Sequence, residues 1–92
     1  MGQILDAIKD AGVENDTIVV LSSDNATGGV LGVGGGSNGP WHGNFFTPPF
    51  EGSYRVPAMI RWPGKVPAGV VSNEVLAAED WMPTLAGLAG EA

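Results

Sequence analysis

The chain has 92 residues, with ten acidic and four basic side chains and a formal net charge of −6 at neutral pH. This balance excludes a basic surface for nucleic acids or anionic membranes. No apolar run approaches the ~20 residues of a membrane-spanning helix, and the absence of cysteine excludes disulfides, thiolate metal sites and a cysteine nucleophile. Fifteen Gly and seven Pro indicate long loops, while an apolar content of 43% argues against wholesale disorder. We expect one small domain or a piece of a larger one.

The first predicted element is a short helix over residues 3–10. Its apolar residues recur at helical spacing, and Gly12 is placed to end it. An unbroken apolar and β-branched run over residues 17–21 then predicts a strand buried on both faces of a parallel sheet. A helix, a short loop and a buried strand form half of an α/β unit, so we expect an α/β fold with a mostly parallel sheet.

The predicted strand ends in small hydroxyls followed by Asp24 and Asn25. Ligands of open α/β sheets bind beyond the carboxyl ends of such strands. The carboxylate and amide oxygens of these two residues suit a hard cation such as Ca²⁺ or Mg²⁺. The alternative is that Asp24 and Asn25 only begin a turn, as such residues often do.

A long loop is predicted over residues 26–53. Its glycine-rich first half matches neither spacing of the common nucleotide-binding motifs, so we expect a mobile or substrate-shaped loop. Its second half carries the only histidine, His42, among several aromatic residues. An imidazole can act as an acid or base, an anion donor or a ligand. The alternative is that His42 is a surface or packing residue.

Three further elements are predicted after the loop. Residues 56–62 form a second apolar strand, and residues 70–76 form a third, short strand. Residues 79–90 form a terminal helix, with acidic residues in its first turn, where the helix dipole favours them. We expect its apolar stripe, which includes Met82 and Leu85, to be buried.

Five passages, in this order, resemble the sulfatases of the alkaline-phosphatase-like superfamily in their arylsulfatase form: residues 17–25, 39–43, 50–57, 60–65 and 80–90. The resemblance covers nearly the whole chain, which is similar to the last part of the family's catalytic domain. It implies that residues 1–92 are a fragment of one such domain, without separate domains. The expected order is helix, strand, long loop, strand, strand and helix, with the loop of residues 26–53 on the active-site side.

The resemblance implies a sulfuric ester hydrolase that uses a formylglycine nucleophile and Ca²⁺. It implies that Asp24 and Asn25 are metal ligands and that Arg55 is structural, paired with a carboxylate. His42 is a candidate catalytic residue or sulfate contact. The substrate of the whole enzyme would be a sulfated small molecule or glycan. Members of the family are often secreted, periplasmic or lysosomal, but the start of this sequence shows no signal peptide, and no compartment is assigned.

The chain departs from the family pattern at several positions. Ala26 stands where the family usually has Gly, His42 where it often has Arg, and Phe46 where it often has a Lys that contacts the sulfate. No residue lies in the Cys/Ser-x-Pro-x-x-Arg motif that yields formylglycine. We therefore expect the nucleophile and the early paired Asp ligands upstream of this segment, and we expect the isolated chain to be inactive.

Two alternative functions stay open. One is a phosphoester or phosphonate monoester hydrolase of the same superfamily, which would share the metal pair. The other is a non-catalytic truncated remnant or interaction module. In a piece of a larger sheet, unpaired strand edges would favour self-association.

Overall fold

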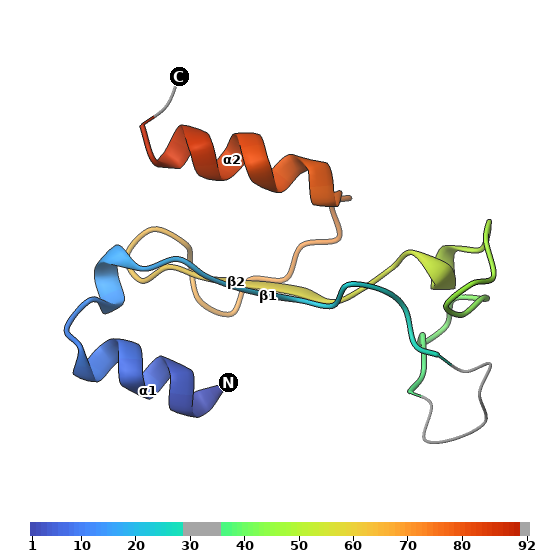
Figure 1. The fold of residues 1–92 in the computed structure, drawn as a ribbon, viewed down its shortest axis with the longest axis horizontal. Coiled ribbons are helices and arrows are strands. Elements are labelled where there is room, and N and C mark those ends of the chain that lie inside the picture. The colour runs from blue at the N-terminus through green and yellow to red at the C-terminus, as the bar shows by residue number, and fades with distance from the viewer. Residues whose placement is uncertain (29–35, 91–92) are drawn as a thin grey trace.

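The computed structural model describes residues 1–28 and 36–90. Two short strands, β1 (Val19–Ser22) and β2 (Ala58–Arg61), form the centre. The helices α1 (Gly2–Asp10) and α2 (Trp81–Leu88) lie on opposite sides of this strand pair (Figure 1). The described part of the loop between the strands extends from one end of the pair, beyond the carboxyl end of β1 (Figure 1).

Helix α1 confirms the first predicted element and begins one residue earlier than expected. Leu5 and Ile8 are half-buried and form its inner stripe. Gly12 follows the helix with a φ of +72°, and its N–H donates to the carbonyl of Lys9 at 2.9 Å. Glycine adopts this left-handed conformation without the steric cost that a side chain would add, which explains why the helix ends there.

The two strands are antiparallel, so the expectation of a parallel arrangement is wrong for this pair. Val19 pairs with Arg61 and Ser22 pairs with Ala58. Parallel neighbours need a crossover, usually a helix, whereas antiparallel neighbours need only a chain reversal. The described part of the connection contains a single 3₁₀ turn, Glu51–Ser53, and no α-helix, and it returns the chain to the end of β1 that it left.

The expected burial of β1 and the predicted third strand are also wrong for the described residues. Val20 and Leu21, whose side chains point to opposite faces of the strand, are 38% and 40% exposed, so neither face of β1 is fully covered. Residues 70–77 form no regular element and do not pair with β2. Each strand therefore has one edge without a partner among the described residues, and self-association through such edges stays a prediction.

The terminal helix is confirmed, but its expected buried stripe is not. A 3₁₀ turn, Ala78–Asp80, leads into α2, where the Asp80 carboxylate accepts the N–H of Ala77 at 2.8 Å. Pro83 occupies the first turn, where a missing N–H costs no helical hydrogen bond. Met82 is 78% exposed and Leu85 is 40% exposed, because no described element packs over this side of the helix.

The hydrophobic core is very small. Ala26, at 5% exposure, is the one buried hydrophobic residue in residues 1–28 and 36–90. The radius of gyration is 16.2 Å, compared with about 12 Å for a compact domain of this length. Within the same residues, no helix has the length and apolarity that crossing a membrane requires.

An ion pair fastens the 3₁₀ turn Glu14–Asp16 to β2. The Arg61 guanidinium donates to the Glu14 carboxylate, and the neighbouring Trp62 indole donates to the carbonyl of Asn15 at 3.0 Å. Glu14→Gln removes the charge and keeps the shape. Because both partners remain partly exposed to water, we expect the free energy of unfolding to fall by about 0.5–1 kcal/mol in chemical denaturation. The matched control is Glu74→Gln at an exposed position, and an equal loss in both variants would contradict a specific role for the pair.

Candidate functional site

Asp24 and Asn25 lie in a bend directly after the carboxyl end of β1. The hydroxyl of Ser23 donates to the carbonyl of Asn25 at 2.9 Å and closes this bend. The Asp24 side chain is exposed, and Asn25 is half-buried. Within the described part of the chain, the Asp24 carboxylate forms no ion pair. The bend therefore presents a free carboxylate beside an amide.

The chemistry of this pair fits a hard divalent cation, but the pair alone does not complete a coordination shell. Ca²⁺ takes six to eight oxygen ligands, from carboxylates, carbonyls and water. No group of three or more acidic or histidine side chains with metal-binding geometry exists in the residues that the structure describes. Asp24 and Asn25 can thus supply one side of a cation site, and further ligands must come from other groups.

The chain that leaves Asn25 is bonded to the loop that carries His42. Thr27 makes the connection with both of its peptide groups. Its N–H donates to the side-chain carbonyl of Asn38 at 3.2 Å, and its C=O accepts the N–H of Phe45 at 3.0 Å. Ala26, at the position where the resemblance implied Gly, is buried at this junction, and its methyl group is accommodated there. The structure therefore ties the predicted metal corner and the predicted histidine loop to each other.

His42 lies on the rim of an open hollow of about 430 Å³. Its ring meets Phe50 edge-on, with ring centres 4.4 Å apart and an angle of 80° between the planes. The hollow is lined by amide, hydroxyl and aromatic side chains (Asn38, Trp41, His42, Asn44, Thr47 and Phe50). Asp24 and Asn25 do not line it. The described residues thus place the histidine and the metal pair on connected segments, but not in one cavity.

The backbone around His42 packs closely against Gly52. The N–H of Gly52 donates to the carbonyl of His42 at 2.8 Å. A Cβ atom on Gly52 would lie 2.6, 2.7 and 2.8 Å from the carbonyl oxygens of His42, Gly43 and Trp41. Gly52 sits in the 3₁₀ turn Glu51–Ser53, at the end of the long loop. The tight turn brings the end of the loop back against its middle.

Arg55 has the carboxylate partner that the resemblance implied. Its Nε donates to the Glu51 carboxylate at 2.6 Å, one helical turn earlier in the chain. Its guanidinium also lies 4.5 Å from the centre of the Trp41 ring, a distance at which cation and ring attract. Arg55 therefore links the turn to the aromatic wall of the hollow, which is a structural role.

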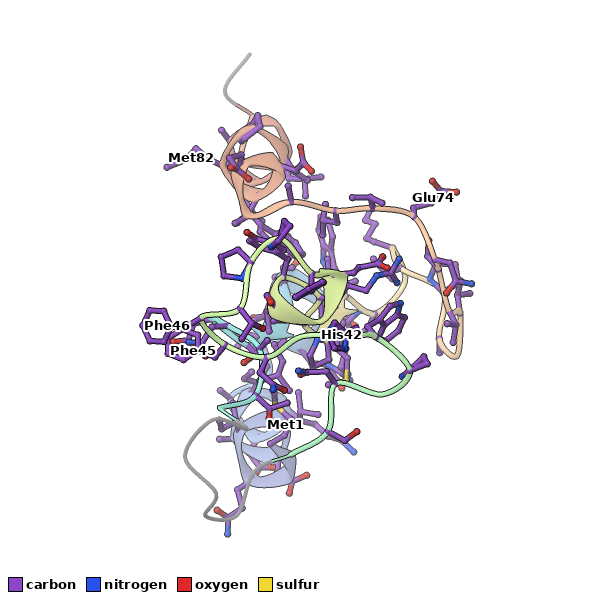
Figure 2. The ribbon with its side chains drawn as sticks, turned by 90° about the vertical axis from the view of Figure 1, so that its right-hand side faces the viewer. Met1, His42, Phe45, Phe46, Glu74 and Met82 are labelled. Atoms are coloured by element: carbon purple, nitrogen blue, oxygen red, sulfur yellow. The ribbon has the colours of Figure 1, made fainter. Side chains whose placement is uncertain are left out.

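Phe46, at the position where the resemblance implied a sulfate-contacting lysine, offers no positive charge. Its side chain is 82% exposed and its φ is +65°, an uncommon conformation for a bulky residue. Its ring lies 3.9 Å from that of Phe45. Figure 2 shows both phenylalanines projecting from one side of the loop, away from His42. The glycine-rich stretch predicted as substrate-shaped lies mostly in residues 29–35, outside the described residues.

Sequence reasoning missed the polar network that holds this loop. Asn38 bridges Thr27 and the residues after His42, and Thr47 bonds both peptide groups of Asn44. Asn38 precedes Gly39 and Pro40 in a turn, which is the one local signal of a structural asparagine. Its partners are distant in the sequence, so the pattern of residues alone does not reveal them.

The Sulfatase family model matches residues 1–91. The chain belongs to the sulfatase family. Its similar relatives include N-acetylgalactosamine-6-sulfatase of the dog Canis lupus familiaris, 39% identical over 91 residues. Human arylsulfatase D is 38% identical over 96 residues, and steryl-sulfatase of Rattus norvegicus is 39% identical over 95 residues.

This sulfatase chain spans only a small part of the relatives that it matches. The three alignments cover 98% of the chain but 17%, 16% and 16% of the relatives' own lengths. No solved structure gives a significant match. Membership of the family suggests an alkaline-phosphatase-like fold, to which the described residues contribute two antiparallel strands and helices.

Proposed function

We propose that this chain forms one side of the active site of a sulfate ester hydrolase. The observation that carries the proposal is the family match over residues 1–91, which includes the bend of Asp24 and Asn25 at the end of β1. The hydrogen bonds of Thr27 support it further, because they hold this bend next to the loop of His42.

In this proposal Asp24 and Asn25 hold a divalent cation, Ca²⁺. Their oxygen donors suit that ion, and the exposed Asp24 carboxylate is free to bind it. A bound cation would offset the negative charge of the sulfate ester in the transition state. The remaining ligands come from other parts of the polypeptide or from water.

His42 is the proposed sulfate contact of this segment. It stands on the rim of the polar hollow, where an imidazole N–H can donate to a sulfate oxygen. The chain has no residue in the Cys/Ser-x-Pro-x-x-Arg motif. We therefore infer that a formylglycine nucleophile is supplied from outside these 92 residues and that the chain alone is inactive. The substrate would be a sulfated small molecule or glycan.

The test has two parts: the coding sequence that adjoins this chain, and an assay of aryl sulfate hydrolysis. The coding sequence that adjoins this chain should contain a Cys/Ser-x-Pro-x-x-Arg motif in frame, and the protein that includes both should hydrolyse an aryl sulfate. A chelator of divalent cations should abolish this turnover, and added Ca²⁺ should restore it. The 92-residue chain should show no turnover above background.

Three outcomes would contradict the proposal. Turnover of aryl sulfate by the isolated chain would show that no external nucleophile is needed. Faster hydrolysis of the matching aryl phosphate would favour a phosphoester hydrolase. The absence of the motif from the adjoining coding sequence would favour a non-catalytic remnant.

A further inference from the structure

The carboxamide of Asn38 joins the two segments that follow the candidate site residues. Its Oδ1 accepts the N–H of Thr27, two residues after Asn25, at 3.2 Å. Its Nδ2 donates to the carbonyl of Gly43, the residue after His42, at 2.5 Å, and to Oδ1 of Asn44 at 3.1 Å. The side chain is half-buried, so these bonds are partly shielded from water and are costly to lose.

The carboxamide of Asn38 carries both the acceptor that Thr27 needs and the donor that Gly43 needs. The N–H of Thr27 requires an acceptor, and the carbonyl of Gly43 requires a donor, so the two backbone groups determine how the amide of Asn38 is turned. A carboxylate offers acceptors alone. An alanine offers neither group, which makes the two substitutions informative in different ways.

The loop held by Asn38 is itself cross-linked. The hydroxyl of Thr47 accepts the N–H of Asn44 at 2.6 Å and lies 2.8 Å from its carbonyl oxygen. The hydroxyl of Ser53 donates to the carbonyl of Thr47 at 2.8 Å. A displacement of Gly43 and Asn44 would therefore also move the rest of the loop. This includes His42, whose carbonyl accepts the N–H of Gly52.

We propose that Asn38 is a positioning residue that sets His42 relative to the bend of Asp24 and Asn25. This inference rests on the proposed function, in which those three residues face one sulfate ester. Among residues 1–28 and 36–90, no hydrogen bond or ring contact joins His42 directly to Asp24 or Asn25. The connection runs through Thr27 and Asn38, with the bond from Phe45 to Thr27 as a second link.

The test compares Asn38→Asp and Asn38→Ala in the full 92-residue chain by NMR. Asn38→Asp keeps the acceptor for Thr27 and loses the donor to Gly43. The amide of Thr27 should therefore exchange with solvent at the wild-type rate, while the imidazole signals of His42 shift. Asn38→Ala should shift the same signals and also speed the exchange at Thr27 by about five- to tenfold, as expected for one lost hydrogen bond.

The matched control is Asn73→Asp, which makes the same change of charge at an exposed residue and should leave both readouts unchanged. Unchanged His42 signals in Asn38→Ala would overturn the inference. Loss of the β1–β2 amide signals in both Asn38 variants would also overturn it, because Asn38 would then support the whole fold. These readouts need no bound Ca²⁺ and no turnover, so they can fail or succeed independently of the proposed sulfate ester hydrolysis.

Discussion

Asp24→Asn should weaken the binding of Ca²⁺ by this chain. The substitution keeps the shape of the side chain and removes its charge, leaving two neutral amides to face the cation. With few protein ligands, we expect wild-type binding to be weak, with a Kd of roughly 10⁻⁴–10⁻³ M, and at least about tenfold weaker in the variant. A Ca²⁺ titration followed through the amide signals of Asp24 and Asn25 measures both affinities.

The control for this substitution is Asp6→Asn, which removes the same charge from an exposed position on α1. It should leave the Ca²⁺ affinity unchanged. Equal affinities of wild-type chain and Asp24→Asn would show that the bend is a turn without a metal-binding role, the alternative that the sequence left open.

The same substitution should have a larger effect on turnover in a protein that carries this segment together with its nucleophile. A cation that stabilises the charge of the transition state supplies several kcal/mol. Each 1.4 kcal/mol corresponds to about a factor of ten in rate, so the loss should exceed about a hundredfold in kcat/KM for an aryl sulfate. A loss below about tenfold would contradict a ligand role for Asp24 on the same arithmetic.

Gly52→Ala should open the loop around His42. The new methyl would meet three backbone carbonyl oxygens at 2.6–2.8 Å, and none of them can rotate away as a side chain would. Forcing an atom into such a space typically costs about 1–3 kcal/mol. We expect limited proteolysis to cleave residues 36–55 about 5- to 150-fold faster in the variant, because each 1.4 kcal/mol raises the population of the opened loop about tenfold. The bond from Gly52 to the carbonyl of His42 should be lost.

The control for the loop is Gly87→Ala in α2. A Cβ atom there meets nothing within 4 Å, and alanine is favoured over glycine in a helix by about 0.5–1 kcal/mol. This variant should be cleaved in the loop at the wild-type rate. If Gly52→Ala behaves in the same way, the loop tolerates a side chain at residue 52 and the close backbone approach is not needed for its order.

Local elements were predictable because local chemistry decides them. The helical spacing of apolar residues and the glycine at residue 12 predicted α1 nearly to the residue, and the terminal helix was found in the same way. The apolar run before Asp24 predicted β1, and the order of five short passages predicted the sulfatase family, which the match over residues 1–91 confirms. The metal and sulfate roles of Asp24, Asn25 and His42 stay predictions.

Pairing and packing were not predictable in the same way. The apolar run of β1 indicated burial on both faces, yet β2 joins it antiparallel and both Val20 and Leu21 remain partly exposed. Hydrophobicity indicates which residues a strand can bury. The pairing direction of the strand and its actual burial depend on the segments that pack against it, which come after a long loop. Met82 in α2 is another example. The apolar stripe of this helix predicted burial, but Met82 is exposed because the stripe does not determine which element packs against it.

The sequence by itself therefore determined the family, the two helices and the position of Asp24 and Asn25 at the end of a strand. Only the tertiary structure decided how the bend and the histidine loop are held together. Asn38 bonds residues on either side of it that lie 11 and 5 positions away, and Gly52 closes against a carbonyl 10 positions earlier. Such contacts form only where the folded backbone brings the partner atoms within a few ångströms of each other. The pattern of residues along the chain does not specify that path.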